Sequence, residues 1–456
     1  MKAHKSWGYA PYKQPFFDTG DIYICRVAPD AHTISFDWLS IGDVTYEVYF
    51  RVRGEGEFIL VGKTKDCTYT ITGLASEQDY EFYVTADGRQ SRIRLARCAP
   101  VVDTVVNYLH PDDEAYEFSG RYLCSPSLVR HPCGFLLASM DLYAGLAPQN
   151  LTLIFRSDDD GKTWKYVSEL FPCFWGKMFI YQGELYMTGV ATEYGDLLIG
   201  KSSDGGKTWS EPTVLLRGSN GKTGHTGVHK NPQPVVEFKG RIWNTLEWGS
   251  WGQWYHAAMV MSAPMGCDLL DADNWSFSEP VKYDPSWPGL PEGRSPGNIE
   301  GALTVVNGEL YNIMRYQMGE MKPNYGYIIS YKVDTENPEN PLQYDHCIPF
   351  PANHSKFEIH YHAGKKKYYS LASRILDEAH SGARNLLSLM VSEDCEHWEV
   401  DRDVIDMRDT DPQQIGFQYV DFFFEGDEIL YLCRTAMNQA HNFHDANYST
   451  FGRIKL

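Results

Sequence analysis

The sequence predicts an all-β protein in which a small β-sandwich precedes a six-bladed β-propeller, with a seven-bladed propeller as the alternative. Three observations lead to this fold class. An eight-residue pattern occurs twice at an interval typical of propeller blades, short strand-like runs recur in sets, and aromatic residues make up 14% of the chain. We therefore expect little helix.

The repeated pattern occupies residues 157–164 (SDDDGKTW) and 202–209 (SSDGGKTW), and both copies fit S-x-D-x-G-x-T-W. Its first five residues favour a tight turn, because aspartate caps its own backbone and glycine accepts a positive φ. Threonine and tryptophan then favour the start of a strand. The copies start 45 residues apart (202 − 157), about the length of one four-stranded blade. We expect the pattern to pin a turn on the outside of a blade, with no catalytic role.

Residues 1–20 are expected to be an N-terminal extension and residues 21–99 a small sandwich. The sandwich is predicted by short β-like runs at 33–38, 46–52, 69–74 and 80–84. The spacing of Leu74 and Tyr80 resembles the tyrosine corner of fibronectin type III domains, with Trp38 as the core tryptophan. This unit is interpreted either as a carbohydrate-binding or docking module or as a spacer that packs on the propeller.

Residues 100–456 are expected to form the propeller. Strand-like runs recur there in six sets: 126–130, 135–141 and 151–156; 177–181, 184–190 and 196–201; 234–237, 241–247 and 256–262; 301–306, 309–315 and 326–332; 357–361, 367–373 and 386–391; 417–424, 428–434 and 447–454. Degenerate copies of the turn pattern are expected at Ser392, Asp394 and Trp398, and around 273–275. We expect a strand from 101–108 to join the last blade and close the ring, since closure removes sheet edges.

Composition excludes several partners. The formal net charge of −19 argues against nucleic acid and anionic membranes, which require a basic surface. No apolar run approaches 18 residues, so no transmembrane helix is predicted. The N-terminus shows no signal peptide and the ten cysteines form no C-x-x-C pair, so we expect free thiols and a cytoplasmic protein, or a secreted one if a leader has been removed. No H-E-x-x-H or phosphate-loop motif appears, so no metal or cofactor is predicted. The oligomeric state stays open.

Polar residues at the ends of the inner strands are the candidates for a site, because a propeller leaves one end of its central channel open. The catalytic candidates are His229, Tyr419, Glu300 and Asp421. The substrate-binding candidates are Asp141, Trp175, Glu193, Glu247, Arg315, Lys356, Arg384, Arg434, His444 and Asn447. Trp251 and Trp254 are further residues whose rings offer a stacking surface for a sugar.

These residue types permit two kinds of glycoside chemistry. Arginine binds a carboxylate in fork geometry, so the charged candidates favour a carboxylate-bearing sugar. In a lyase, arginine or lysine neutralises a uronate while His or Tyr removes the neighbouring proton and protonates the leaving oxygen. In a hydrolase, a Tyr or a carboxylate attacks the anomeric carbon while an acid protonates the leaving oxygen.

The segment 121–128 (RYLCSPSL), followed by GFLLAS from Gly134, is similar to the first blade of true sialidases. The repeated pattern likewise looks like the Asp box, or BNR repeat, of sialidase-type propellers. True sialidases carry Tyr-Arg-Ile-Pro in the first blade, and that arginine binds the sialic acid carboxylate. Cys124 occupies its place here and cannot make the bidentate pair, which argues against ordinary sialidase activity.

The rest of the chain resembles one branch of sialidase-like propellers. The resemblance rests on 141–143, 193–195, His229, 262–264, 268–275, 416–421, 434–436 and 444–448. It points to lyases and glycosidases that act on rhamnose–glucuronate linkages, and so implies an acidic glycan as substrate. We therefore expect an enzyme that cleaves a glycosidic bond in an acidic glycan by a lyase route. A hydrolytic exo-glycosidase of sialidase type and a non-catalytic glycan-binding propeller are the alternatives.

Overall fold

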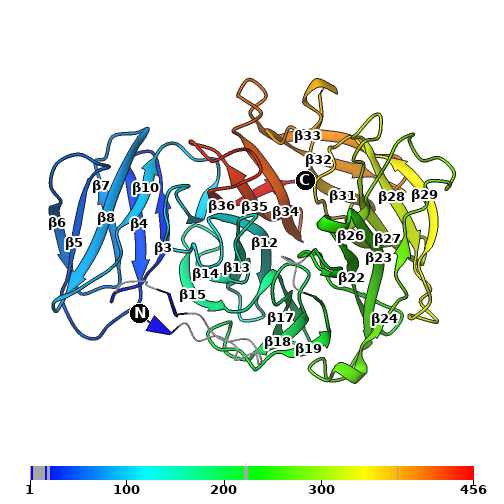
Figure 1. Cartoon of the computed structure of the whole chain (residues 1–456), viewed down its shortest axis with the longest axis horizontal. Helices are drawn as coiled ribbons and strands as arrows, with labels where there is room; N and C mark the ends of the chain where they lie inside the picture. The colour runs from blue at the N-terminus through cyan, green and yellow to red at the C-terminus, as the bar shows by residue number, and fades with distance from the viewer. Residues whose placement is uncertain (1, 4–15, 18–20, 220–223, 377) are drawn as a thin grey trace.

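The computed structural model describes residues 2–3, 16–17, 21–219, 224–376 and 378–456. The fold is all-β, with 52% of residues in strands and 2% in helices. Figure 1 shows a small blue unit on one side and a larger ring of sheets beside it. The expected extension at 1–20 lies outside the described residues except for β1 (Lys2–Ala3) and β2 (Phe16–Phe17), which pair antiparallel.

The first unit consists of two antiparallel sheets around one apolar core. One sheet contains β3 (Ile24–Pro29), β4 (Thr33–Trp38) and β7 (Thr68–Thr72). The other has the order β10 (Arg94–Cys98), β8 (Gln78–Ala86), β5 (Tyr46–Val52) and β6 (Ile59–Thr64), with β9 (Arg89–Gln90) paired to β8. Alternate residues of β4 and β8 are buried, as expected when each sheet has one face on the core. The expected sandwich is therefore present.

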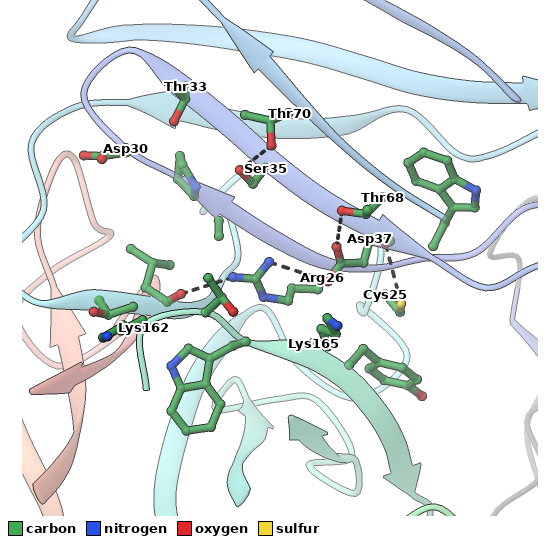
Figure 2. A pocket seen from close by; sticks show the side chains of 18 of the residues that line it. Cys25, Arg26, Asp30, Thr33, Ser35, Asp37, Thr68, Thr70, Lys162 and Lys165 are labelled. Carbon is green, nitrogen blue, oxygen red and sulfur yellow. Dashed lines mark hydrogen bonds and ion pairs between the residues drawn. The ribbon is translucent and has the colours of Figure 1, made fainter. Parts of the chain in front are cut away.

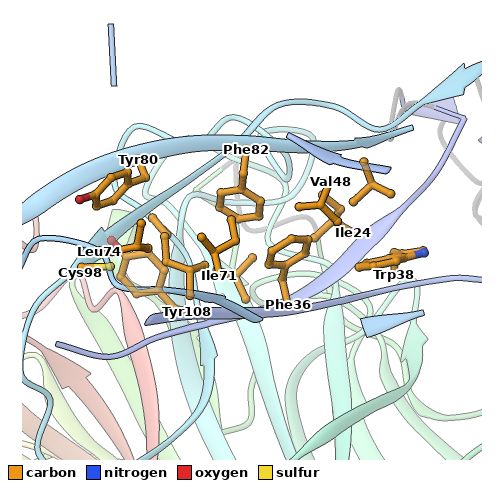
Figure 3. Packing of buried hydrophobic residues seen from close by; sticks show 14 of the residues in the cluster. Ile24, Phe36, Trp38, Val48, Ile71, Leu74, Tyr80, Phe82, Cys98 and Tyr108 are labelled. Atoms are coloured by element: carbon orange, nitrogen blue, oxygen red, sulfur yellow. The ribbon is translucent and has the colours of Figure 1, made fainter. Parts of the chain in front are cut away.

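The aromatic residues that predicted the sandwich lie in its core. Figure 3 shows Trp38, Phe36, Phe82 and Tyr80 between the two sheets. The Tyr80 hydroxyl accepts a hydrogen bond from the Ala75 backbone N–H at 2.8 Å. A tyrosine bonded to backbone a few residues upstream is the geometry of a tyrosine corner. Kinship with fibronectin type III domains stays a proposal.

The remaining sheets form the propeller. Four are four-stranded and antiparallel, and one of these closes the ring. The other three are β12 (Tyr122–Arg130), β13 (Leu136–Tyr143), β14 (Thr152–Ser157) and β15 (Lys165–Leu170); β16 (Phe174–Tyr181), β17 (Glu184–Val190), β18 (Leu197–Ser202) and β19 (Thr213–Leu216); β30 (His360–His362), β31 (Lys367–Ser373), β32 (Leu386–Ser392) and β33 (Glu399–Asp406).

A larger sheet lies between the second and third of these. Its first part contains β20 (Gly227–His229), β21 (Val236–Phe238), β22 (Arg241–Ser250), β23 (Tyr255–Pro264), β24 (Ser276–Phe277) and β25 (Val281–Lys282). Its second part contains β26 (Gly297–Val306), β27 (Glu309–Gln317), β28 (Tyr327–Lys332) and β29 (Gln343–Pro349). One residue pair, His256 with Gly297, joins the parts. We interpret them as two blades, so the six-bladed count stays our interpretation.

The ring closes as expected. β11 (Thr104–Tyr108) pairs with β36 (Tyr448–Lys455), which continues through β35 (Glu428–Ala436) to β34 (Gly416–Glu425). A strand that precedes the first blade thus completes the last one. Arg130 of β12 reinforces the closure, because its guanidinium makes two hydrogen bonds to Glu425 of β34, at 2.6 and 2.8 Å.

In all three predicted turn patterns an aspartate bonds the backbone of its own turn, and the two full copies share one geometry. In the first, Asp159 accepts from the Thr163 N–H at 2.9 Å and the Thr163 hydroxyl at 2.6 Å. Asp204 repeats both contacts, and Asp394 of the degenerate copy accepts from the His397 N–H at 2.8 Å. Each turn joins the third and fourth strands of its sheet, which agrees with the expected structural role.

The segment 273–275 differs from these turns. A 3-10 helix, η3 (Ala272–Asn274), precedes Trp275, whose indole donates to the Leu269 carbonyl at 3.0 Å. The other described helices are the 3-10 helices η2 (Trp251–Gln253) and η4 (Glu378–His380).

The sandwich packs directly on the propeller. Tyr108 and Tyr448, of the closing strands, belong to the sandwich core, so the two units share apolar contacts. Arg26 of β3 donates to the Val106 carbonyl at 2.8 Å. A cavity of about 830 Å³ remains between β4 and the first turn pattern, and Figure 2 shows Arg26 and Asp37 on one side of it and Lys162 and Lys165 on the other. The division at residue 100 stays a proposal.

Candidate active site at the centre of the propeller

Four inner strands carry the same local distortion. Ser125, Trp175, Glu300 and Tyr419 have φ values of 52°, 53°, 59° and 56°, although none is glycine. Each lies at a register shift in β12, β16, β26 or β34. A β-bulge re-aims a side chain, and a left-handed non-glycine residue is strained, so these positions are held by the surrounding structure.

All four distorted residues line one cavity of about 470 Å³. The sequence also predicted His229, Arg315, Arg384, Arg434, Glu193 and His444 as site residues, and these line the same cavity. Side chains that are up to 319 residues apart in sequence (444 − 125) therefore meet at the hub.

His229 is oriented by a buried carboxylate. Its Nδ1 lies 2.5 Å from Oε2 of Glu247, and both residues are buried. Oε1 of Glu247 accepts from the Glu300 N–H at 2.9 Å, so one carboxylate positions two cavity residues. Burial raises the pKa of Glu247, and the contact with His229 opposes that rise. Because Nδ1 is engaged, Nε2 is the nitrogen of His229 that remains for a ligand.

Arg315, Glu300 and Tyr419 form a second cluster. One Arg315 nitrogen donates to Glu300 at 2.6 Å and to the Tyr419 hydroxyl at 2.9 Å. Burial on its own raises the pKa of Glu300, but the Arg315 guanidinium outweighs it and the net pKa lies below the ordinary value. Glu300 is thus a carboxylate, and the Tyr419 oxygen is held beside a fixed positive charge.

Arg384 and Arg434 lie near the Tyr419 ring of this cluster, and neither has a carboxylate partner among the described residues. Their guanidinium carbons lie 5.6 and 5.1 Å from the centre of the Tyr419 ring. Arg384 donates to the Gln418 side chain, and Arg434 donates to the His444 carbonyl at 2.5 Å. Burial, together with Arg315 and Arg434, lowers the pKa of Arg384 to about 10. Arg384 remains a cation at neutral pH. The Nε of Arg384 and the Nε of Arg434 are each buried without a hydrogen-bond partner.

A layer of buried charges lies outside this lining, on β16, β34 and the segments that precede the neighbouring strands. Lys177 pairs with Asp421 at 2.5 Å, and Lys356 pairs with Glu358 at 2.6 Å. Lys356 also donates to the Val420 carbonyl at 3.1 Å, next to Tyr419. Lys230 is fully buried, and burial with the charge of Lys177 lowers its pKa to about 7.

Two predicted site residues belong to this layer. We expected Asp421 to be catalytic and Lys356 to bind substrate, but neither lines the cavity. Asp421 is two residues past the bulge at Tyr419, and its second oxygen accepts from the Leu128 N–H at 2.5 Å. These predictions are corrected: Asp421 bonds Lys177 and the β12 backbone, and Lys356 bonds Glu358 and the β34 backbone, so both side chains are used by structural contacts.

Three more predicted binding residues lie behind the lining. Glu247 supports His229, as described above. Asp141 accepts from the Thr152 hydroxyl at 2.5 Å and the Gly176 N–H at 3.2 Å, beside the bulge at Trp175. Asn447 bonds the backbone of Met437 in both directions. The polar side-chain groups of these three residues are hydrogen-bonded within the protein, so they are not available to a ligand.

Cys124 immediately precedes the β-bulge at Ser125 in β12 and lines the cavity. Burial raises the pKa of its thiol to about 12, so it is neutral at physiological pH. Cys124 therefore presents an uncharged thiol at the position where the sequence analysis noted that true sialidases carry an arginine. All ten cysteines are free, as the sequence predicted.

The sequence reasoning missed several lining residues. These are Ser125, Tyr143, Gly145, Gln149, Phe174 and Gln317. It also missed His256, whose Nε2 lies 3.1 Å from the Tyr194 hydroxyl next to His229. Small or apolar residues such as Gly145 and Phe174 carry no chemical signal in a sequence. His256 is the second residue of β23 and begins the expected run at 256–262, so its position at a strand end could have marked it.

Among the described residues, no group of three or more His, Cys, Asp or Glu side chains is arranged to hold a metal ion. In the same part of the chain, no helix is long and apolar enough to cross a membrane.

Comparison with known proteins identifies the fold. No known protein-family profile matches the chain, and no curated protein is found as a relative. Solved structures do match. An α-L-arabinanase of Penicillium chrysogenum, solved with arabinobiose, has a TM-score of 0.51 at 14% identity, covering 78% of this chain and 98% of its own. A leech intramolecular trans-sialidase, solved with 2,7-anhydro-Neu5Ac, has a TM-score of 0.50 at 9% identity, covering 95% and 91%. The fold is thus the β-propeller of sialidases and arabinanases.

Proposed function

We propose that this protein is a carbohydrate-active enzyme that cleaves a glycosidic bond next to a uronate, by a lyase route. One observation carries the proposal. Arg384 and Arg434, two buried cations without a carboxylate partner among the described residues, flank Tyr419 in a cavity that also contains the His229–Glu247 pair. Buried charges are normally paired, so this arrangement favours an anionic ligand group. A sugar carboxylate fits the cavity volume and the fork geometry of arginine.

The proposed reaction uses the groups as they lie. The uronate carboxylate binds Arg384 and Arg434, which stabilise the negative charge that develops when the neighbouring C5 proton is removed. His229 takes that proton on Nε2, because Glu247 holds Nδ1. The electron pair of the C5–H bond forms the C4–C5 double bond, and the C4–O bond breaks. Tyr419 gives its hydroxyl proton to the leaving oxygen, and Arg315 at 2.9 Å stabilises the phenolate that remains.

A hydrolytic route is the second candidate, and the Tyr419–Arg315–Glu300 cluster favours it. A tyrosine hydroxyl next to a carboxylate and a guanidinium is suited to attack an anomeric carbon. The arabinanase and trans-sialidase of the same fold act on glycosides, which supports glycoside chemistry but not either route. The first-blade cysteine counts against a sialic acid substrate.

One experiment separates the routes. Acidic plant and algal glycans are incubated with the protein in ¹⁸O-labelled water, beside His229→Ala and Arg434→Ala. The lyase route gives ultraviolet absorbance from an unsaturated uronate and no labelled oxygen in the products. Hydrolysis gives one labelled oxygen per cleavage and no absorbance. Products formed equally by wild type and both variants would place the chemistry elsewhere and refute this site.

A further inference from the structure

Two tryptophans stand exposed at the mouth of the cavity. Trp251 and Trp254 are 41% and 40% exposed, whereas Trp164 and Trp243 are almost fully buried. Exposed indoles cost free energy unless something covers them, because each leaves a large apolar area in water. Both belong to the turn between β22 and β23, which contains η2.

This turn is continuous with the cavity. Trp251 itself lines the cavity. Trp254 lies against the segment that follows β27: a Cβ at Gly319 would stand 3.5 Å from its ring. Gln317, two residues before Gly319, lines the cavity as well. Trp254 therefore lies beside the segment that carries the cavity residue Gln317, although it does not itself line the cavity.

The turn is also held rigidly. The Ser250 hydroxyl caps η2 by accepting from the Gly252 N–H at 3.1 Å, and the Trp251 N–H donates to the Tyr194 hydroxyl at 3.0 Å. Trp254 has φ 49° and ψ 48°, a left-handed conformation that is rare for a bulky residue. Strain of this kind persists at sites where it serves a function. The Arg294 guanidinium lies 4.6 Å from the Trp254 ring, so a cation is present beside the exposed indole.

We propose that Trp251 and Trp254 form an outer sugar-binding subsite, which stacks on the sugar residue that follows the one held in the cavity. The inference rests on the proposed function and extends it: the substrate is an oligosaccharide or polysaccharide, not a monosaccharide glycoside with a small leaving group. Aromatic rings suit this task because the C–H face of a sugar is apolar and the ring loses little conformational entropy on binding. Arg294 adds affinity when the outer part of the chain is acidic.

The subsite predicts that affinity depends on chain length. Dissociation constants are measured by titration calorimetry with free D-glucuronate and with a tetrasaccharide of alternating rhamnose and glucuronate. The tetrasaccharide is measured in a His229→Ala background, so that it is not consumed. We expect Trp254→Ala to weaken tetrasaccharide binding at least tenfold and to change glucuronate binding less than twofold. Trp254→Phe, which keeps a ring, restores most of the affinity, and Ile59→Ala, an exposed apolar residue of the sandwich, changes neither constant.

Trp251→Ala is the second variant, since its backbone contact with Tyr194 survives the substitution. It is expected to weaken tetrasaccharide binding by more than it weakens glucuronate binding. Equal losses for both probes, or no loss with either tryptophan variant, overturn the subsite while leaving the proposed function standing. If wild type does not bind glucuronate and the background protein does not bind the tetrasaccharide, the proposed function and the subsite fall together.

Discussion

Nδ1 of His229 lies 2.5 Å from Oε2 of Glu247, and the other oxygen of Glu247 bonds the backbone of Glu300. A single buried carboxylate thus fixes the imidazole and one strained residue of the neighbouring blade. This relationship makes His229 the best-oriented base in the cavity. The first prediction follows from it.

His229→Ala should lower turnover of an acidic glycan by about 10²–10⁴-fold, the usual contribution of a general base. Glu247→Gln should lower turnover less, because the imidazole stays but loses the carboxylate that orients it. Initial rates across pH 5–9 test this. Identical pH profiles for wild type and Glu247→Gln would contradict the orienting role.

Arg384→Ala and Arg434→Ala should each weaken glucuronate binding by about 10–100-fold, since a hydrogen bond to a charged group contributes about 1.5–3 kcal/mol. Arg402→Ala removes an exposed arginine of β33 and serves as the matched control. Titration calorimetry at two salt concentrations measures the effect. A loss in the control equal to that at Arg384 would show a nonspecific charge effect.

Lys356→Met should destabilise the protein by about 3–5 kcal/mol, because it leaves Glu358 buried and ionised without its cation. The double variant Lys356→Met/Glu358→Gln should regain part of that loss, as the charge is removed as well. Thermal unfolding at pH 7 compares the variants. Destabilisation by the double variant equal to the sum of both single effects would mean that the two side chains do not interact.

Asp141→Asn should change the pH dependence of stability. Burial raises the pKa of Asp141 from 3.8 to about 7 in the folded state. The neutral carboxyl therefore makes its full contribution to the free energy of unfolding below pH 3.8, and this contribution is lost as the pH rises to 7. Asparagine does not ionise, so the Asn variant keeps its stability across that window. The difference in the free energy of unfolding between the variant and wild type therefore grows in favour of the variant, to the order of 3 kcal/mol. Denaturant titrations of both proteins at pH 4.5 and 7.5 measure this stability difference. The same difference at both pH values would contradict the raised pKa of Asp141.

Asp159→Ala should cost about 1–2 kcal/mol of stability and leave glycan turnover unchanged, because Asp159 bonds only its own turn. Asp158→Ala, in the same turn, removes only a contact to the exposed Arg156 side chain and should cost less than 0.5 kcal/mol. Melting temperatures and rates of both variants test the structural assignment. Lost turnover at an unchanged melting temperature would argue for a catalytic role of the turn.

The sequence predicted more of the fold than of the site. Strands such as 241–247 and 428–434 are buried on both faces and are rich in apolar residues, so those strands were found. Outer strands such as β15 and β33 are partly exposed and carry charged residues, so no apolar pattern marked them. In the third set, the expected strand at 234–237 is β21, and a further short strand that was not expected, β20, lies ahead of Pro232 and Pro234.

For the site, position at a strand end predicted which residues meet but not which way they point. Tyr419 and Asp421 are two residues apart and were both predicted as catalytic, yet the bulge turns Tyr419 into the cavity and leaves Asp421 bonded to Lys177. A bulge depends on contacts from the neighbouring blade, such as that of Lys356 with the Val420 carbonyl. No local pattern encodes such a contact.

The sequence by itself determined the all-β class, the sandwich ahead of the propeller, the pinned turns and the closing strand, because each follows from local turn chemistry and alternation of apolar residues. Only the tertiary structure decided which charges face the cavity and which pair beneath it, since that choice depends on partners hundreds of residues away. Arg384 and Arg434 lie beside Tyr419 without a carboxylate partner among the described residues because the fold brings them together from different strands.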